Sequence, residues 1–381
     1  MTIASLLQSN GYRTAMVGKW HLGFQENGYD KSLPGGPADR GFDSYFGIRA
    51  STDIPPYFYI RGNRAVAPPT DHIEANNSKG WSPIQGAFWR AGGIAPGLQL
   101  KDVLPRFTDE AITVIEGHAK SKTKKPLMLY LAYPAPHTPW LPSPEFQGSS
   151  RAGMFGDFLV MVDAMIGRVL KALDEAGISD DTLLFFCSDN GPVWYDTDVK
   201  RLGHDSVGGL RGMKADAWEG GHRMPFIARW PKKIKDGSTS AQTICLTDVM
   251  ATCAALTGAT IPPNAAEDSY NILPVLLGQA GDKPVREYTL HQTISLALAI
   301  RHGNWKYLDH KGSGGNNYGR EGEWGMKQFA LPERAPDAPG QLYDLAKDPG
   351  ETTNLYNEYP EIVKALKGKL EEYKTSGRSA P

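Results

Sequence analysis

The chain has 381 residues, a length that suits one large domain plus a smaller one. Its 41 Lys and Arg residues nearly balance its 42 Asp and Glu residues, which gives a net charge of -1. This balance predicts neither a nucleic-acid-binding surface nor a polybasic membrane patch. No apolar run approaches the roughly 18 residues of a membrane span. The three cysteines form no disulfide framework and match no zinc spacing: Cys187, Cys245 and Cys253.

The chain opens with a short helix pattern followed by a strand pattern. Ile3, Leu6 and Leu7 share one helical face, and Gly11 suits the residue after a helix end. Thr14 to Val17 is an apolar run that Gly18 closes.

Lys19 and His21 follow this strand two residues apart. In an extended chain, side chains two apart point the same way, so a cation and an imidazole are expected to leave the strand end together. Ligands of open α/β sheets bind at the carboxyl ends of strands. The alternative is a solvated lysine and a hydrogen-bonded histidine in an ordinary loop.

Residues 24–100 are rich in loops, prolines and aromatic residues, a composition that fits either a binding face or a long loop pinned to the core. A helix is predicted from Thr108, as its cap, to His118. Leu127–Tyr133 is a continuous apolar run typical of a strand buried on both faces. It leads into a proline-rich loop that holds His137.

The second half of the chain alternates helix and strand patterns before it changes character. Residues 154–176 keep the 3.6-residue apolar period of a helix, and the next strands and helix are predicted at Leu183–Cys187, Phe226–Trp230 and Thr247–Leu256. This rhythm predicts a mostly parallel sheet covered by helices. From Pro284 onward the pattern becomes short strands at hairpin spacing and a final helix opened by Pro360. We therefore predict two domains, 1–283 and 284–381.

Polar residues gather at three predicted strand ends and in one glycine-rich stretch. Asp189 and Asn190 are adjacent oxygen donors of the kind that suits Ca²⁺ or Mg²⁺, although Asp-Asn-Gly-Pro is also an ordinary turn sequence. Lys214 lies in the glycine-rich stretch, where the alternative is a solvated surface lysine. One cation-oxygen site with lysines and histidines suits transfer of a tetrahedral oxyanion, whose oxygens need several fixed positive groups.

Taken in order, these stretches resemble the arylsulfatase A-like branch of the sulfatase family. The resemblance runs nearly end to end and rests on six motifs: Gly18-Lys19-Trp20-His21-Leu22-Gly23, Pro136-His137-Thr138-Pro139, Ser188-Asp189-Asn190-Gly191, Leu210-Arg211-Gly212-Met213-Lys214, Glu219-Gly220-Gly221 with Arg223 and Pro225, and the tail from Leu342 to Leu355. It implies an α/β fold, an alkaline-phosphatase-like α/β/α sandwich with a small C-terminal α+β domain. It also implies hydrolysis of sulfate esters at a Ca²⁺ site.

Carried over by position, the resemblance implies a role for each of the polar residues. Asp189 and Asn190 would be metal ligands, and Lys19 and Lys214 would bind sulfate oxygens. His137 would contact a sulfate or leaving-group oxygen and act as the acid. His21 would sit beside the nucleophile and take its proton when sulfate is expelled.

One family feature is missing from the printed sequence. The family's nucleophile is a formylglycine made from Cys or Ser in a Cys/Ser-x-Pro-x-Arg motif upstream of the Gly-Lys-Trp-His stretch, and this chain holds no such motif. The family's paired aspartates of the first strand are absent as well. We therefore expect this polypeptide alone not to turn over sulfate esters, since loss of a nucleophile leaves only residual electrostatic help. Loss of a central strand would also expose unpaired strand edges.

Two other functions are alternatives to a sulfatase whose N-terminal part is not in this sequence. One is a non-catalytic protein that binds sulfated glycans, and the other is a phosphoesterase of the same superfamily. Coding DNA upstream of Met1 distinguishes the glycan-binding protein from an enzyme. The missing motif in frame would indicate a sulfatase, whereas a stop codon close upstream would favour a fragment or a binding protein. The substrate, an aryl sulfate or a sulfated sugar, is not readable from the sequence. The N-terminal residues lack the basic flank of a signal peptide, so only family analogy points to a periplasmic, secreted or lysosomal location.

Overall fold

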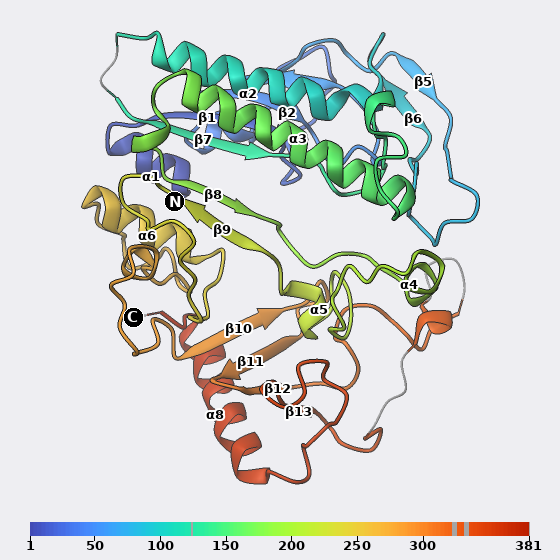
Figure 1. The fold of residues 1–381 in the computed structure, drawn as a ribbon, viewed down its shortest axis with the longest axis vertical. Coiled ribbons are helices and arrows are strands. Elements are labelled where there is room, and N and C mark those ends of the chain that lie inside the picture. Colours follow the sequence, from blue (N-terminus) through green and yellow to red (C-terminus); the bar gives the residue numbers. More distant parts are fainter. Residues whose placement is uncertain (123–124, 322–325, 331–334, 381) are drawn as a thin grey trace. The chain divides into compact units, whose positions relative to one another are not determined.

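Strand β1, Arg13–Lys19, lies inside a five-stranded sheet in the computed structural model of the chain. The structure describes residues 1–122, 125–321, 326–330 and 335–380. These residues form two units, Met1–Thr182 with Thr257–Ala259, and Leu183–Leu256 with Thr260–Pro381. Each unit is described by itself below (Figure 1). The domain boundary that the sequence predicts near residue 283 was placed where the short-strand pattern begins, and it stays a prediction.

The first unit is built on a mixed sheet in the order β4-β3-β2-β1-β7. Strand β1 runs parallel to both β2 and β7, whereas β3 is antiparallel to β2 and to β4. The sequence predicted a mostly parallel sheet, so this expectation is corrected to a mixed one. The elements of this unit are α1 Ile3–Ser9, β1 Arg13–Lys19, β2 Ser44–Ile48, β3 Tyr59–Arg61, β4 Arg64–Ala65, β5 Asp71–Ile73, β6 Gly92–Ile94, α2 Val103–Ala119, β7 Leu127–Ala132 and α3 Gly153–Glu175, with short 3₁₀ turns at Pro37–Arg40, Leu100–Asp102, Pro144–Phe146 and Ser179–Asp181.

Apolar side chains on both faces of β1 bury this sheet. Met16 packs with Ala4 of α1 on one face, and the next residue, Val17, packs with Phe107 of α2 on the other. The alternation follows from the two-residue period of a strand. In Figure 1, α2 and α3 lie side by side over one face of the sheet. Helices and loops therefore cover both faces, and the carboxyl ends of β1 and β7 share one edge.

Two local predictions for this unit are wrong. Helix α2 begins at Val103, and Thr108 lies buried inside it, where Oγ1 donates a 3.0 Å hydrogen bond to the carbonyl of Leu104. Thr108 is therefore no cap. Strand β7 is confirmed, but Tyr130 is 50% exposed, because β7 is the last strand of this sheet among the residues described.

The second unit holds a two-stranded and a four-stranded antiparallel sheet. Strand β8 pairs with β9, and the second sheet has the order β10-β11-β12-β13. Helix α8 packs on the latter through Val363, Leu366 and Leu370, which meet Ile300 and Tyr307. The elements of this unit are β8 Leu184–Cys187, α4 Asp196–Leu202, α5 Glu219–His222, β9 Phe226–Arg229, α6 Asp248–Thr257, α7 Leu273–Leu276, β10 Tyr288–Gln292, β11 Leu298–His302, β12 Trp305–Leu308, β13 Gln341–Asp344 and α8 Pro360–Ser376, with a 3₁₀ turn at Lys327–Phe329.

Candidate functional site

The Lys19–His21 segment continues the pairing of β1 beyond the end of the strand. The backbone N–H groups of Trp20 and His21 donate to the carbonyls of Ile48 and Arg49, at 3.1 and 3.0 Å. His21 is exposed and has a φ of 60°, a conformation that costs free energy for a residue with a side chain. The chain is therefore not extended at His21, so simple alternation does not decide where this side chain points, and the shared direction of Lys19 and His21 stays a prediction. Strained residues of this kind cluster at functional sites.

His137 follows β7, the parallel neighbour of β1. The register pairs Gly18 with Ala132, so the Lys19–His21 segment and the loop of His137 leave the same edge of the sheet. Gly18 has a φ of 124°, and a Cβ at this position would lie 2.0 Å from the carbonyl oxygen of Ala132. Only glycine allows the two strand ends to approach this closely.

The loop around His137 is held by its own hydrogen bonds. Thr138 Oγ1 donates to the carbonyl of Gly86 at 2.9 Å, and Trp140 Nε1 donates to the carbonyl of Pro136 at 2.9 Å. His137 Nδ1 lies 2.7 Å from the Thr138 carbonyl and 3.7 Å from Asp53 Oδ1. Such contacts fix the position of the imidazole, as a catalytic or binding group requires.

Asp53 is a residue that the sequence reasoning missed. Its side chain is 5% exposed and forms a 2.5 Å ion pair with Arg90. Because Asp53 lies in the loop-rich stretch and far from His137 in sequence, no local pattern links the two residues. A carboxylate beside a histidine orients the ring and stabilises its protonated form.

Asp189 and Asn190 form the turn that follows β8 in the second unit. Asp189 is exposed, and Asn190 is half-buried and donates from Nδ2 to the carbonyl of Gly191 at 2.9 Å. Ser188 Oγ donates to the carbonyl of Asn190 at 3.0 Å. Since the amide nitrogen of Asn190 is used internally, its side-chain oxygen is the atom that can serve as a ligand.

Lys214 is tied to this turn through the backbone. Its N–H donates to the carbonyl of Pro192 at 2.9 Å, and its own carbonyl accepts from Asn316 Nδ2 at 2.9 Å. The structure thus brings Lys214 beside the Asp189–Asn190 turn, although the two are more than twenty residues apart in the sequence.

Close backbone packing explains the glycines of this region. Gly191 donates its N–H to the carbonyl of Gly221 at 2.9 Å, and a Cβ on Gly191 would lie 1.9 Å from the carbonyl oxygen of Gly220. Real side chains do not approach a carbonyl this closely, so the turn and α5 can touch only through glycines. Helix α5 therefore sets the position of the turn.

A buried ion network holds α5 in place. Lys306 is fully buried on β12, and its Nζ lies 2.9 Å from both Glu219 Oε1 and Glu351 Oε1. Burial raises the pKa of Glu219, but the hydrogen bond with His222 and the charge of Lys306 outweigh burial and hold that pKa far below its usual range. The carboxylate of Glu219 is therefore ionised at neutral pH. Burial raises the pKa of Glu351 against the opposing charge of Lys306.

The predicted site residues thus fall into two groups. The first unit holds Lys19, His21 and His137 at one sheet edge, and the second holds Asp189, Asn190 and Lys214 around one turn. Whether the two groups converge on one ligand stays a prediction.

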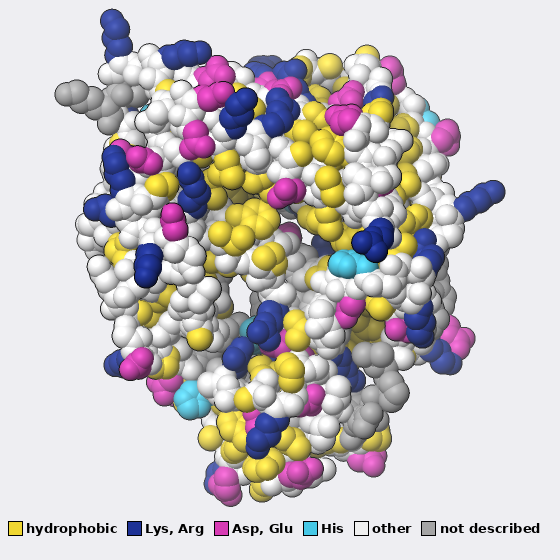
Figure 2. Space-filling model, in the orientation of Figure 1, with side chains coloured by type: hydrophobic (Ala, Val, Ile, Leu, Met, Phe, Trp, Pro, Cys, Tyr) yellow, Lys and Arg dark blue, Asp and Glu magenta, His cyan; other side chains and the backbone are white. Residues whose placement is uncertain are grey.

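The surface carries no single-sign field on the face drawn in Figure 2, where basic and acidic side chains are interspersed. Among the described residues, no helix is both long and apolar enough to cross a bilayer.

Comparisons with known proteins identify the family. The model of the Sulfatase family matches residues 1–259. The N-acetylgalactosamine-6-O-sulfatase of Bacteroides thetaiotaomicron is 33% identical to this chain, over 98% of the chain and 77% of that protein. Arylsulfatase A of Homo sapiens is 30% identical, over 96% of the chain and 70% of that protein.

Solved structures agree with the sequence comparisons. A structure from work on glycosaminoglycan metabolism by Bacteroides thetaiotaomicron superposes with a TM-score of 0.82 at 32% identity, over 98% of this chain and 82% of that one. A sulfatase from Pseudoalteromonas sp., 22% identical, shares the fold with a TM-score of 0.73 over 98% of this chain and 72% of that one. The alkaline-phosphatase-like α/β fold is therefore confirmed, and the chain belongs to the sulfatase family.

Proposed function

We propose that this protein recognises sulfate esters of sugars and that its own residues bind the sulfate group. Membership of the sulfatase family, with a sugar 6-O-sulfatase 33% identical over nearly the whole chain, is the observation that carries this proposal. The sulfated-sugar class comes from that relative, and the printed sequence supports the general class of sulfate ester.

Each residue has a defined part in this proposal. Lys19 and Lys214 supply positive charge to the sulfate oxygens, which share the negative charge of the ester. His137, held by the Thr138 carbonyl and beside Asp53, donates a hydrogen bond or a proton to the leaving-group oxygen. His21 offers an imidazole for proton transfer at the exposed end of β1.

Asp189 and Asn190 fit a Ca²⁺ ion in donor type but not in number. Both supply oxygen atoms, the ligands that Ca²⁺ prefers, whereas the ion takes about 6–8 of them. A bound Ca²⁺ would draw charge away from the sulfate oxygens. In this chain the two residues would hold only part of its coordination shell.

The family's formylglycine does not fit this polypeptide, because the printed sequence holds no Cys/Ser-x-Pro-x-Arg motif. We therefore expect binding of sulfated sugars without turnover by the chain alone.

The test is calorimetric titration of the full chain with N-acetylgalactosamine 6-sulfate and, as the matched control, with N-acetylgalactosamine. We expect binding of the sulfated sugar only, with no release of inorganic sulfate from it or from an aryl sulfate. Equal affinity for both sugars, or no binding of either, would overturn the proposed function. Sulfate release at ordinary enzyme rates would overturn the expectation that the chain is inactive alone.

A further inference from the structure

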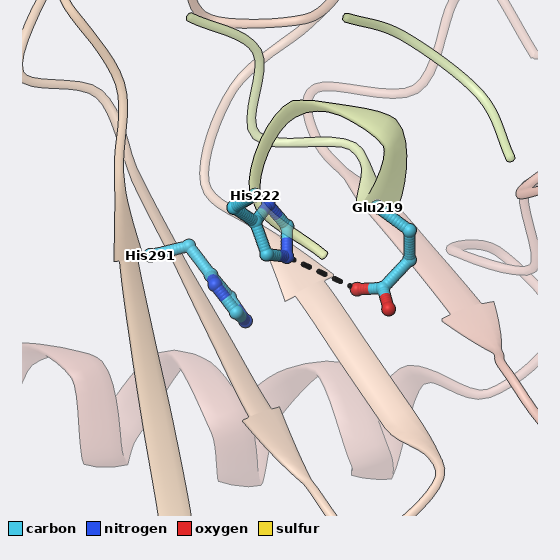
Figure 3. Close-up of side chains that lie close together, drawn as sticks. All are labelled: Glu219, His222 and His291. Carbon is cyan, nitrogen blue, oxygen red and sulfur yellow. Dashed lines mark hydrogen bonds and ion pairs between the residues drawn. The ribbon is translucent and has the colours of Figure 1, made fainter. Parts of the chain in front are cut away.

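Three side chains that the proposed function does not use come together in the second unit. Glu219 and His222 extend from α5, and His291 extends from β10 (Figure 3). One possible ligand atom from each lies within 4.8 Å of the others. The rings of His222 and His291 pack with their centroids 3.8 Å apart.

We infer that Glu219, His222 and His291 form a binding site for a transition-metal ion, with Zn²⁺ as the best fit. Two imidazoles and one carboxylate are a ligand set that Zn²⁺ uses in proteins, with an open fourth position. The set differs in kind from Asp189 and Asn190, whose oxygen atoms suit a hard cation such as Ca²⁺. This second site is independent of the proposed function.

The local geometry is already close to that of a metal site. His222 Nε2 lies 3.2 Å from Glu219 Oε1, and two ligands about 2 Å from a tetrahedral ion stand roughly 3.3 Å apart. The i, i+3 spacing of these two residues places them on one face of a helical turn. His291 must approach by a side-chain rotation, since the three atoms lie up to 4.8 Å apart.

A buried ring nitrogen of His291 that lacks a hydrogen-bond partner in the described part of the chain supports this assignment. Its Nε2 is buried and has no hydrogen-bond partner among the described residues. Buried polar atoms without a partner are rare in native proteins and need an explanation. A metal ion at this position would satisfy the ring nitrogen of His291.

A metal-bound imidazole is neutral, and it binds the ion through one ring nitrogen while the other nitrogen carries the proton. His222 would carry its ring proton on Nδ1 when Nε2 binds the ion.

The positive charges of Lys306 and Arg223 do not prevent a divalent ion from binding. Lys306 bridges Glu219 and Glu351, so it keeps Glu351 as a partner when Glu219 turns toward a metal. Arg223 Nη1 lies 3.8 Å from Glu219 Oε2, but its side chain is 59% exposed, so solvent screens its charge.

The experiment is equilibrium dialysis of the untagged full chain against Zn²⁺, followed by metal analysis. The chain carries Cys187→Ser, because an exposed thiol can bind zinc by itself. The test variants are His222→Gln and His291→Gln. The matched control is His302→Gln, since His302 on β11 is 47% exposed and lies 3.7 Å from Glu287, as part of a surface His–Glu pair.

We expect one equivalent of Zn²⁺ on the parent chain and on the His302→Gln control, and a loss of at least about tenfold in affinity for each test variant. Substitution by Co²⁺ should give the visible absorption of a tetrahedral ion, and each test variant should lose it. His222 is only partly buried, so His222→Gln is expected to fold, as a circular dichroism melt would verify.

Two outcomes would overturn the site. One is a parent chain that retains no Zn²⁺ after dialysis, which would leave the histidine pair as a packing contact. The other is an equal loss of zinc in the test variants and in the control, which would place the ion elsewhere.

Discussion

The backbone N–H of Lys214 donates a 2.9 Å hydrogen bond to the carbonyl of Pro192, two residues beyond Asn190. This bond joins a predicted sulfate-binding lysine to the predicted metal-binding turn inside one unit of the protein. A ligand that orders the turn is therefore expected to order Lys214 as well.

Lys214→Ala should weaken binding of a sulfated sugar by about 10-fold to 100-fold, because hydrogen bonds to charged groups contribute about 1.5–3 kcal/mol. Lys19→Ala should have an effect of the same size if both lysines contact the sulfate. Calorimetric titration measures both. Lys200→Ala is the control, since Lys200 is exposed and paired with Asp196. An unchanged affinity for Lys214→Ala would remove this residue from the site.

Gly191→Ala should destabilise the second unit by about 1–3 kcal/mol, as overpacked cores do, because its Cβ would meet the carbonyl of Gly220. Urea unfolding measures the change. Gly368→Ala in α8 is the matched control, where a Cβ meets no atom within 4 Å, and helix propensity predicts a gain of about 0.5–1 kcal/mol. If both substitutions act alike, the close contact between the turn and α5 is not real.

Lys306→Met should cost about 3–5 kcal/mol of unfolding free energy, since it leaves the buried carboxylates of Glu219 and Glu351 without their cation. Denaturant unfolding followed by circular dichroism measures this loss. Lys347→Met, at an exposed lysine, should change stability by less than about 0.5 kcal/mol. A small effect of Lys306→Met would show that the network contributes little.

Stability of the second unit should fall as the pH drops below about 6.5. His222 and His291 have pKa values lowered by burial in the folded state, so below pH 6.5 the unfolded chain binds more protons. The slope approaches about 1.4 kcal/mol per pH unit for each histidine until its folded pKa is reached. Glu219, whose pKa is also lowered in the folded state, adds a further loss below its ordinary pKa of 4.5.

Unfolding curves recorded at several pH values between 5 and 8 would measure this slope, and His291→Gln should reduce it. A stability that is flat across this range, or that rises toward acid, would contradict burial of neutral histidines.

Sequence alone predicted the elements whose signal is local. Helix α3, with its continuous 3.6-residue period, and strands β1, β7, β8 and β9 lie where their apolar runs place them. The family was also recognised, because its motifs keep their order along the chain.

Features that depend on long-range partners were missed. Strand β2 lies in a segment that reads as loop, and its pairing with β1 buries Tyr45 and Phe46. The positive φ of His21 was not predicted either, and it occurs where the His21 N–H donates to the carbonyl of Arg49, just beyond β2. The cluster of Glu219, His222 and His291 was missed as well, because His291 is about seventy residues away from the other two and no local pattern links them.

The network around Lys306 has a consequence for how this protein can be divided. Glu219 and Arg211 precede residue 283, whereas their partners Lys306, Tyr343 and Glu351 follow it. A recombinant fragment that ends at residue 283 would lack the partners of the buried Glu219 carboxylate and the buried Arg211 guanidinium. We therefore expect that fragment to be recovered mainly as insoluble material, and co-expression with residues 284–381 to restore its yield.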